Sequence, residues 1–406
     1  MKGCSDVPPM PDPARPVGAA RIRSFRETVF AEMSALSAKH GAVNLGQGFP
    51  DFAAPDFVKD AAKRAIDADH NQYAHPHGVP ALREAIAADW SMRYGIELDP
   101  ARHVTVTSGA TEAIFDIVQA LIDPGDELIV FEPFYDSYPA SVTMAGGVMR
   151  GIRLREPDWT FDPAELEAAI TPRTRAILLN TPHNPTGKVF SRTELELIAN
   201  LARQHDLVVV TDEVYDRIVF DGAEHVPIAT LPGMWDRTLT LNSVGKTFSI
   251  TGWKIGYAIG PEPLINALRA VHQWVTFATS TPFQVAMAES MEVASATGYY
   301  DDLVRAYTER RDELTVGLID AGLPVLRTAG SYFLMADFSQ HNPATDVEFS
   351  RFLISEVGVT PIPPSAFYSD PTTAPQLVRF CFAKKRSTLQ EASRRLQTLR
   401  AMLVAD

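Results

Sequence analysis

Cysteine is nearly missing from this chain of 406 residues, which contains only Cys4 and Cys381. Two cysteines, one near the amino terminus and one in the apolar stretch LVRFCFA, provide neither a disulfide framework nor a cysteine-based metal site. A cysteine in an apolar stretch, such as Cys381, usually serves as a small buried hydrophobic residue. His75, His77 and His183 also lack the spacing of metal ligands. The sequence therefore predicts no metal site.

Long apolar runs and an excess of positive charge are absent as well. No apolar stretch reaches the roughly 20 residues that a membrane-spanning helix needs. The first residues are rich in proline and lack the apolar segment of a signal peptide. The 50 acidic residues outnumber the 37 basic ones, and a net charge of −13 is unfavourable for binding nucleic acid or an anionic membrane. We expect a cytoplasmic protein with no nucleic-acid or membrane partner.

Apolar residues make up 46% of the chain, enough for a normal core, and its length favours two domains. Between residues 51 and 290, apolar strands alternate with amphipathic helices, as in a mostly parallel sheet with helices on both faces. We predict a large α/β domain over 51–290 and a smaller α+β domain formed by 25–50 and 291–406. The Pro-rich segment 1–24 is predicted to be a flexible arm. The seven expected strands of the large domain cover 103–108, 126–133, 148–154, 174–182, 207–215, 238–249 and 253–260.

Polar residues that could bind a ligand or take part in catalysis gather where these strands end. In open α/β sheets, ligands bind at the carboxyl ends of the strands. The GKT sequence at 245–247 resembles a nucleotide-binding loop, but Thr240 stands where that loop needs a glycine. Another explanation is therefore needed for the residues that follow the strands, which are Gly109, Ala110, Thr111, Asn184, Asp212, Tyr215, Ser243, Lys246 and Lys254.

Three requirements define the ligand of this set. The Gly109 turn opens a helix, and with Ser243 and one lysine it favours a phosphate. Asp212 follows four apolar residues, so its carboxylate is expected to be buried and to need a cationic partner. A desolvated lysine has a lowered pKa and can form a Schiff base. Pyridoxal 5′-phosphate meets all three requirements, because its pyridinium nitrogen is such a cation. These arguments leave open whether Lys246 or Lys254 is the nucleophile.

The motifs NTPHNPTG, DEVY and SVGKTFSITGWKIGY occur in this order, with Asp212 28 residues after Asn184 and Lys246 34 residues after Asp212. Together they resemble the fold-type-I, class-I/II aminotransferases that depend on pyridoxal phosphate. The stretches VNLGQGFPDF, NQYAHPHGVPALREAI, GDELIVFEPFYDSY, GSYFLMADF and VRFCFAKK are similar to the group of kynurenine aminotransferase, glutamine transaminase K and methionine aminotransferase. The resemblance covers roughly residues 25 to 400.

The resemblance implies a role for each cofactor-binding residue. Lys246 would form the Schiff base and move the proton, and Gly245 would permit a tight turn before it. Asp212 would pair with the pyridine nitrogen, so that Lys246, Asp212 and Tyr215 form the catalytic group. Tyr135 would stack on the ring. The phosphate would be held by Lys254, Ser243 and the backbone of Gly109, Ala110 and Thr111, and the ring O3′ by Asn184 and Tyr215.

The resemblance also implies a substrate clamp and a homodimer with shared active sites. Arg379 would bind the substrate carboxylate in a bidentate fork, helped by Asn184 and the backbone of Gly46. Tyr73 would reach the phosphate of the partner subunit, and Phe277 would line the partner's pocket.

Aromatic residues expected near the mouth of the pocket favour large, uncharged side chains such as those of methionine, glutamine, phenylalanine, tyrosine and kynurenine. Kynurenine is less favoured, because Ala278 stands where the kynurenine-type branch often has histidine. Two alternatives stay open: a cysteine-S-conjugate β-lyase on the same cofactor, and an N-succinyldiaminopimelate aminotransferase, which needs a second carboxylate binder. A DNA-binding regulator is disfavoured by the charge and by the lack of a spare domain. The expected mouth residues are Phe49, Phe134, Tyr135, Trp274, Phe277, Phe367 and Tyr368.

Overall fold

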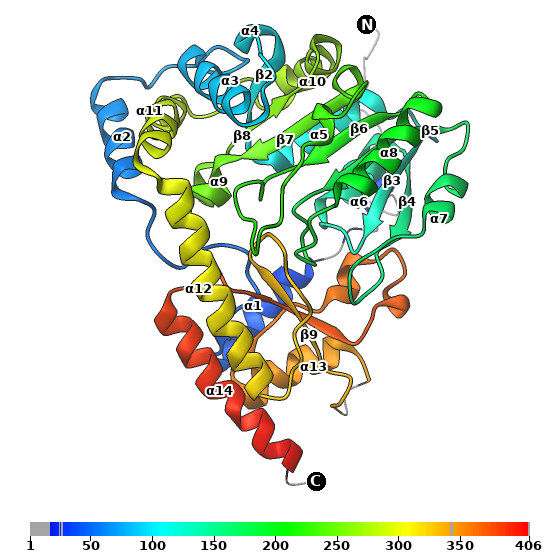
Figure 1. Ribbon diagram of the computed structural model, residues 1–406, viewed down its shortest axis with the longest axis vertical. Coiled ribbons are helices and arrows are strands. Elements are labelled where there is room, and N and C mark those ends of the chain that lie inside the picture. Colours follow the sequence, from blue (N-terminus) through cyan, green and yellow to red (C-terminus); the bar gives the residue numbers. More distant parts are fainter. Residues whose placement is uncertain (1–16, 24, 26, 342–343, 405–406) are drawn as a thin grey trace, which may run out of the picture.

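The computed structural model describes residues 17–23, 25, 27–341 and 344–404 (Figure 1). The predicted arm 1–24 therefore lies largely outside the described residues. The central feature is a seven-stranded sheet, and its strands are parallel except that β8 runs antiparallel to both neighbours. The expected mostly parallel seven-stranded sheet is thus confirmed. Its strand order is β2 (Val104–Ser108), β8 (Ile255–Ile259), β7 (Thr238–Ser243), β6 (Val208–Asp212), β5 (Thr174–Asn180), β3 (Glu127–Glu132) and β4 (Val148–Arg153).

Alternate residues of the central strands point to opposite faces of the sheet, and each face is covered by helices. Leu128 and Val130 belong to a cluster with α5 (Gly109–Leu121), α6 (Ser137–Ala145) and α10 (Glu262–Val275). Ile129 and Phe131 pack into a separate cluster that includes α7 (Pro163–Ala168) and α8 (Arg192–Gln204). Strands buried on both faces explain why their sequences are continuous apolar runs. The edge strand β2 and its neighbour β8 pack against α2 (Asp56–Asp67), α3 (Pro80–Tyr94) and α11 (Thr281–Thr297).

A second unit lies below the sheet in Figure 1 and combines the two ends of the described chain. The antiparallel pair β9 (Phe333–Asp337) and β11 (Leu377–Cys381) forms its centre, and β1 (Val43–Asn44) pairs with β10 (Val359–Thr360). Strand β10 is only two residues long, because Pro361, Pro363 and Pro364 follow it and cannot donate to a ladder. The helices of this unit are α1 (Val29–His40), α12 (Tyr299–Asp320), α13 (Asp346–Phe352) and α14 (Arg386–Val404).

Helix α11 runs across position 291, where the sequence pattern places the domain boundary. Met291 and Ala294 pack with the helices beside β2 and β8. After Gly298, α12 descends along α14 into the lower unit, where Tyr307 joins its core (Figure 1). We propose that the two domains divide at Gly298. Among the described residues, no helix is both long and apolar enough to cross a membrane.

Candidate active site

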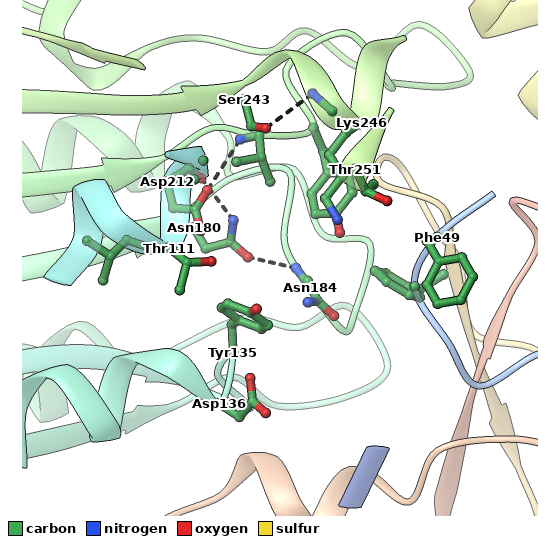
Figure 2. Close-up of a pocket in the computed structure, with 18 of the residues that line it drawn as sticks. Phe49, Thr111, Tyr135, Asp136, Asn180, Asn184, Asp212, Ser243, Lys246 and Thr251 are labelled. Atoms are coloured by element: carbon green, nitrogen blue, oxygen red, sulfur yellow. Dashed lines mark hydrogen bonds between the residues drawn. The ribbon is translucent and has the colours of Figure 1, made fainter. Parts of the chain in front are cut away.

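A cavity of about 380 Å³ lies between the carboxyl edge of the sheet and the lower unit (Figure 2). The turns after β5, β6 and β7 and the start of α5 form one side, and residues of α1, β9 and β11 form the other. Its volume is in the range of a small-molecule site. The structure brings most of the predicted site residues together here, namely Gly109, Ala110, Thr111, Tyr135, Asn184, Asp212, Tyr215, Ser243, Lys246, Lys254 and Arg379.

The start of α5 forms an anion cradle. Gly109 has φ +76°, a backbone conformation that side-chain-bearing residues rarely adopt. A Cβ atom there would lie 3.1 Å from Lys254 Nζ, so this ammonium group sits at the first turn of the helix. Lys254 itself has φ +55°, a strained conformation for a residue with a side chain. Free N–H groups, the helix dipole and an ammonium group together favour a phosphate at this position.

Ser243 lies beside the cradle at the end of β7. Its hydroxyl donates to the carbonyl oxygen of Ile255 at 3.2 Å and accepts from the backbone N–H of Gly245 at 3.1 Å. Gly245 does not have the positive φ that a glycine-dependent turn would show, and it lies in the short helix α9 (Val244–Thr247). The expected role of this glycine in a tight turn is therefore wrong. A Cβ at Gly245 would lie 3.1 Å from Thr251 Cα, so the glycine allows close packing instead.

Asp212 ends β6 and is 4% exposed. One carboxylate oxygen accepts from the hydroxyl of Tyr138 at 2.8 Å, and the other accepts from the N–H of Val214 at 3.3 Å. No basic side chain of the described residues forms an ion pair with it. Burial raises the pKa of Asp212 to about 6, although Tyr138 and the Val214 N–H oppose this shift. The carboxylate is charged at neutral pH and lacks the cation that a buried charge requires.

Lys246 projects from α9 into the cavity (Figure 2). Burial lowers the pKa of this lysine to about 8, so an appreciable share of the amine is neutral near neutral pH. The rings of Tyr215 and Tyr332 lie 5.7 Å from its Nζ and enclose it. A partly neutral amine in a closed cavity is suited to nucleophilic attack on a carbonyl group and to proton transfer.

Arg379, in the centre of β11, is 1% exposed and faces the cavity. Its Nη1 donates to Asn184 Oδ1 at 2.8 Å, and its Nη2 donates to the carbonyl oxygen of Gly46 at 2.8 Å. The Nε–H has no partner among the described residues, and no acidic side chain pairs with the guanidinium. A buried cation with unused donors is suited to binding a carboxylate.

Three residues of the site were not found from the sequence, although they lie in quoted motifs. Asn180, at the end of β5, accepts from the Asn184 N–H at 2.8 Å and donates to the Asp212 carbonyl at 2.9 Å, so it joins two strand ends (Figure 2). Tyr138 is the second tyrosine of EPFYDSY and binds Asp212. Asp136, in the same motif, lines the cavity, and burial raises the pKa of its carboxyl group.

Only part of the expected aromatic mouth lines the cavity. Phe49 and Tyr135 do so, together with Phe30 and Phe333, which the sequence did not identify. The other expected residues do not line it: Phe134, Phe367 and Tyr368 are buried in the core, and Trp274 is exposed on the surface.

Tyr73 and Phe277 lie outside this cavity. Their side chains are exposed, and their rings pack edge to face with centroids 5.5 Å apart. The structure thus places them together on the surface and away from the cavity of their own chain.

The residues present fit pyridoxal 5′-phosphate. The cradle with Lys254 would accept its phosphate, the unpaired Asp212 would accept a pyridinium N–H, and the amine of Lys246 lies within the same cavity. Arg379 remains free for a second, carboxylate-bearing molecule. The fold and the site together define a fold-type-I enzyme of the pyridoxal-phosphate-dependent class.

Comparisons with known proteins agree with this class. The family model for aminotransferases of class I and II matches residues 40–396, and the chain belongs to this family. The protein is therefore a pyridoxal-phosphate-dependent aminotransferase. It is 41% identical to kynurenine–oxoglutarate transaminase 1 of Rattus norvegicus, over 93% of this chain and 97% of that protein.

Two further relatives differ in their named substrates. A probable N-succinyldiaminopimelate aminotransferase of Mycobacterium tuberculosis is 45% identical, over 94% of this chain and 98% of that protein. The solved structure of YbdL from Escherichia coli, described as having a methionine aminotransferase function, superimposes with a TM-score of 0.91 at 38% identity. That alignment covers 95% of this chain and 100% of YbdL.

Proposed function

We propose that the enzyme transfers the α-amino group of amino acids with large, uncharged side chains to a 2-oxo acid. The observation that carries this proposal is the distribution of charge in the cavity. Lys246 and Lys254 lie at the cofactor end, so Arg379 is the single lining cation left for substrate among the described residues. Phe30, Phe49 and other aromatic rings form the remaining wall, together with the carboxyl group of Asp136.

The same distribution disfavours substrates with a second carboxylate. Such a substrate needs another cation, and in this chain it would meet Asp136 instead. Methionine, glutamine, phenylalanine, tyrosine and kynurenine are consistent with an aromatic wall. N-succinyldiaminopimelate and aspartate are not.

The proposed roles follow from the contacts. Lys254, Ser243 and the N–H groups of Gly109–Thr111 hold the phosphate, and Asp212 holds the pyridinium N–H. Asn184 and Tyr215 line the cavity on the side proposed for the ring O3′, and Tyr135 is proposed to cover one ring face. Arg379 binds the substrate carboxylate, and Asn184 Oδ1 and the Gly46 carbonyl oxygen orient its guanidinium group by accepting from it.

Once bound, pyridoxal 5′-phosphate acts as an electron sink for the pair left on the substrate Cα. The chain's own residues supply the rest. Lys246 would hold the cofactor covalently through its Nζ, and once freed it would take the proton from the substrate Cα as a neutral base. Its lowered pKa keeps this amine available near neutral pH. General acid–base transfer of this kind typically contributes about 10²- to 10⁴-fold.

A spectroscopic half-reaction tests the proposal. The purified, cofactor-loaded enzyme is mixed with one amino acid at a time, without an oxo acid, and conversion of the cofactor to its amine form is followed. We expect fast conversion with methionine, glutamine and aromatic amino acids and slow conversion with aspartate and N-succinyldiaminopimelate. Faster conversion with either dicarboxylate would contradict the proposed specificity. Pyruvate release from a cysteine S-conjugate, without conversion by any amino acid, would identify the lyase alternative.

Asp212→Asn is expected to weaken cofactor binding and to slow proton abstraction about 10²-fold or more, because the amide cannot compensate a pyridinium charge. Burial raises the pKa of Asp212 to about 6, so this group is protonated below that pH and ionised above it. Cofactor affinity of the wild-type apoenzyme should therefore fall as the pH drops through 6. The phosphate also titrates in this range, so the Asn variant, which keeps the phosphate but lacks the carboxylate, is the control. An equal pH dependence in both proteins would remove the proposed role.

Tyr138→Phe removes one hydrogen bond from the buried Asp212 carboxylate and leaves the ring in place. Loss of a hydrogen bond to a buried charge costs about 1.5–3 kcal/mol, so cofactor affinity should fall roughly 10-fold or more. The pKa of Asp212 should rise further, and the pH dependence of binding should shift upward. An unchanged pH profile would show that Tyr138 only packs.

We also propose that the enzyme is a homodimer in the cytoplasm. Tyr73, Trp274, Val275 and Phe277 are large, exposed apolar residues, and two of them pack against each other. Such a surface favours a protein interface. The two cysteines of the sequence and the free, buried thiol of Cys381 are consistent with a reducing compartment. Sedimentation equilibrium tests the dimer, and Trp274→Glu should weaken it.

A further inference from the structure

A buried histidine outside the cavity joins two parts of the proposed site. His272 lies in the last turn of α10 and is 1% exposed. Its Nδ1 lies 2.9 Å from Glu112 Oε1, and its Nε2 lies 2.8 Å from the carbonyl oxygen of Pro76. A carbonyl and a carboxylate can only accept, so both ring nitrogens must carry protons. The geometry is that of a buried imidazolium cation.

A second acidic residue, Asp116, stabilises the protonated form of His272. Asp116, one turn further along α5, is fully buried, and its Oδ2 lies 3.7 Å from His272 Nδ1. Neither of its oxygens has a hydrogen-bond partner among the described residues. Burial alone would lower the pKa of His272, but Asp116 and Glu112 outweigh it and raise this pKa to about 10.

The cluster lies directly behind the phosphate cradle. Glu112 is in the first turn of α5, and its other oxygen accepts from the backbone N–H of Ser108, the residue before Gly109. Glu112 therefore fixes the turn from β2 into α5. An uncompensated carboxylate in this turn would repel a phosphate dianion, and in a poorly solvated environment the repulsion is substantial. The imidazolium of His272, which also faces Asp116, is the cation that compensates this charge.

On its other side, His272 holds the segment that carries Tyr73. The Pro76 carbonyl accepts from His272 Nε2, and the same segment positions Tyr73 against Phe277 on the surface. The two surface residues are those proposed to reach the partner's active site. His272 thus contacts both the cradle of its own chain and the segment directed at the partner's cradle.

We propose that His272 is a positioning residue that couples cofactor retention to subunit pairing. It neutralises Glu112 behind the phosphate cradle and anchors the 73–78 segment through Pro76. This inference rests on the proposed cofactor site and homodimer.

A charge-compensation cycle tests the inference. His272→Gln, Glu112→Gln and the double variant are compared for the dissociation constant of pyridoxal phosphate from the apoenzyme and for dimer dissociation by sedimentation. His272→Gln should raise the cofactor dissociation constant about 10-fold, as expected for one uncompensated nearby charge, and should weaken the dimer. Adding Glu112→Gln should restore most of the cofactor affinity but not the dimer, since the contact to Pro76 stays altered. His341→Gln, in the lower unit, is the matched control and should change neither quantity.

The outcomes separate the inference from a general packing effect. If the double variant loses as much cofactor affinity as the two single variants together, charge compensation by His272 is overturned. Glu112→Gln alone should leave cofactor affinity unchanged or tighter, so a 10-fold loss there would also overturn it, even if His272→Gln does not fold. Glu112, Asp116 and His272 also offer ligand atoms within 4.8 Å of one another. A stoichiometric divalent metal in the purified holoenzyme would mean that a metal ion, and not a proton on His272, compensates the acids, and it would overturn the inference. Failure of the wild-type protein to bind pyridoxal phosphate would instead reject the proposed function.

Discussion

Lys246→Ala is expected to retain non-covalent cofactor binding and to lose transamination by about 10⁴-fold or more. The phosphate cradle, Asp212 and Tyr135 remain in place, so the cofactor can still be held. Among the described residues that line the cavity, the substitution removes the one lysine amine that does not lie at the proposed phosphate cradle. The measurement is the single-turnover half-reaction with methionine, together with mass spectrometry after borohydride reduction, which should no longer attach the cofactor to the chain.

Lys254→Ala is the matched control for this result. Lys254 Nζ lies at the first turn of α5, so its removal should raise the dissociation constant of the cofactor while covalent attachment and turnover persist at saturating cofactor. Each variant removes one lysine of the same cavity, but Lys246→Ala should abolish turnover, whereas Lys254→Ala should weaken cofactor binding. Retained turnover by Lys246→Ala, or loss of covalent attachment in Lys254→Ala, would reverse the assignment of the two lysines.

Arg379→Lys is expected to lower kcat/KM about 10²-fold for every amino acid, mainly through KM. Lysine keeps the charge but cannot form the bidentate fork or preserve the hydrogen bonds to Asn184 and Gly46. Arg379→Ala, which removes the charge as well, should cost about 10³-fold, consistent with losing two charge-assisted hydrogen bonds.

Comparing several amino acid substrates shows whether Arg379 binds the α-carboxylate or the side chain. Because the α-carboxylate is common to all amino acids, methionine and phenylalanine should lose similar factors. A loss confined to one side chain would show that Arg379 reads the side chain instead. Arg379 is buried, so thermal unfolding of both variants must be measured, and the lysine variant, which keeps most of the volume, is the safer comparison.

Much of the site could be predicted because its residues follow strands. Asp212 ends β6, Asn184 and Lys246 lie within four residues of the ends of β5 and β7, and parallel strands bring their carboxyl ends to one edge. Local sequence therefore identified nine of the eleven predicted residues that line the cavity. The substrate clamp came from the resemblance alone, because Arg379 lies in β11, more than a hundred residues beyond the sheet.

Contacts that depend on packing could not be predicted. Tyr138 lies in a quoted motif, yet only the position of α6 over the sheet brings its hydroxyl to Asp212. The same applies to the mouth of the cavity, where the packing of the lower unit determines which rings face inward. Phe30 and Phe333 line the cavity, whereas the expected Phe134, Phe367 and Tyr368 are buried in the core.

By itself, the sequence determined the mostly parallel sheet, the class of cofactor and the order of the residues proposed to hold it. These properties depend on apolar periodicity and on local motifs, which short stretches of chain contain in full. Only the tertiary structure decided which buried charges are paired. Glu112 and His272 stand 160 residues apart, and Arg379 and Gly46 stand 333 apart. Pairing over such separations is set by how helices and units pack, because a buried charge is stabilised by whichever partner the fold brings within reach.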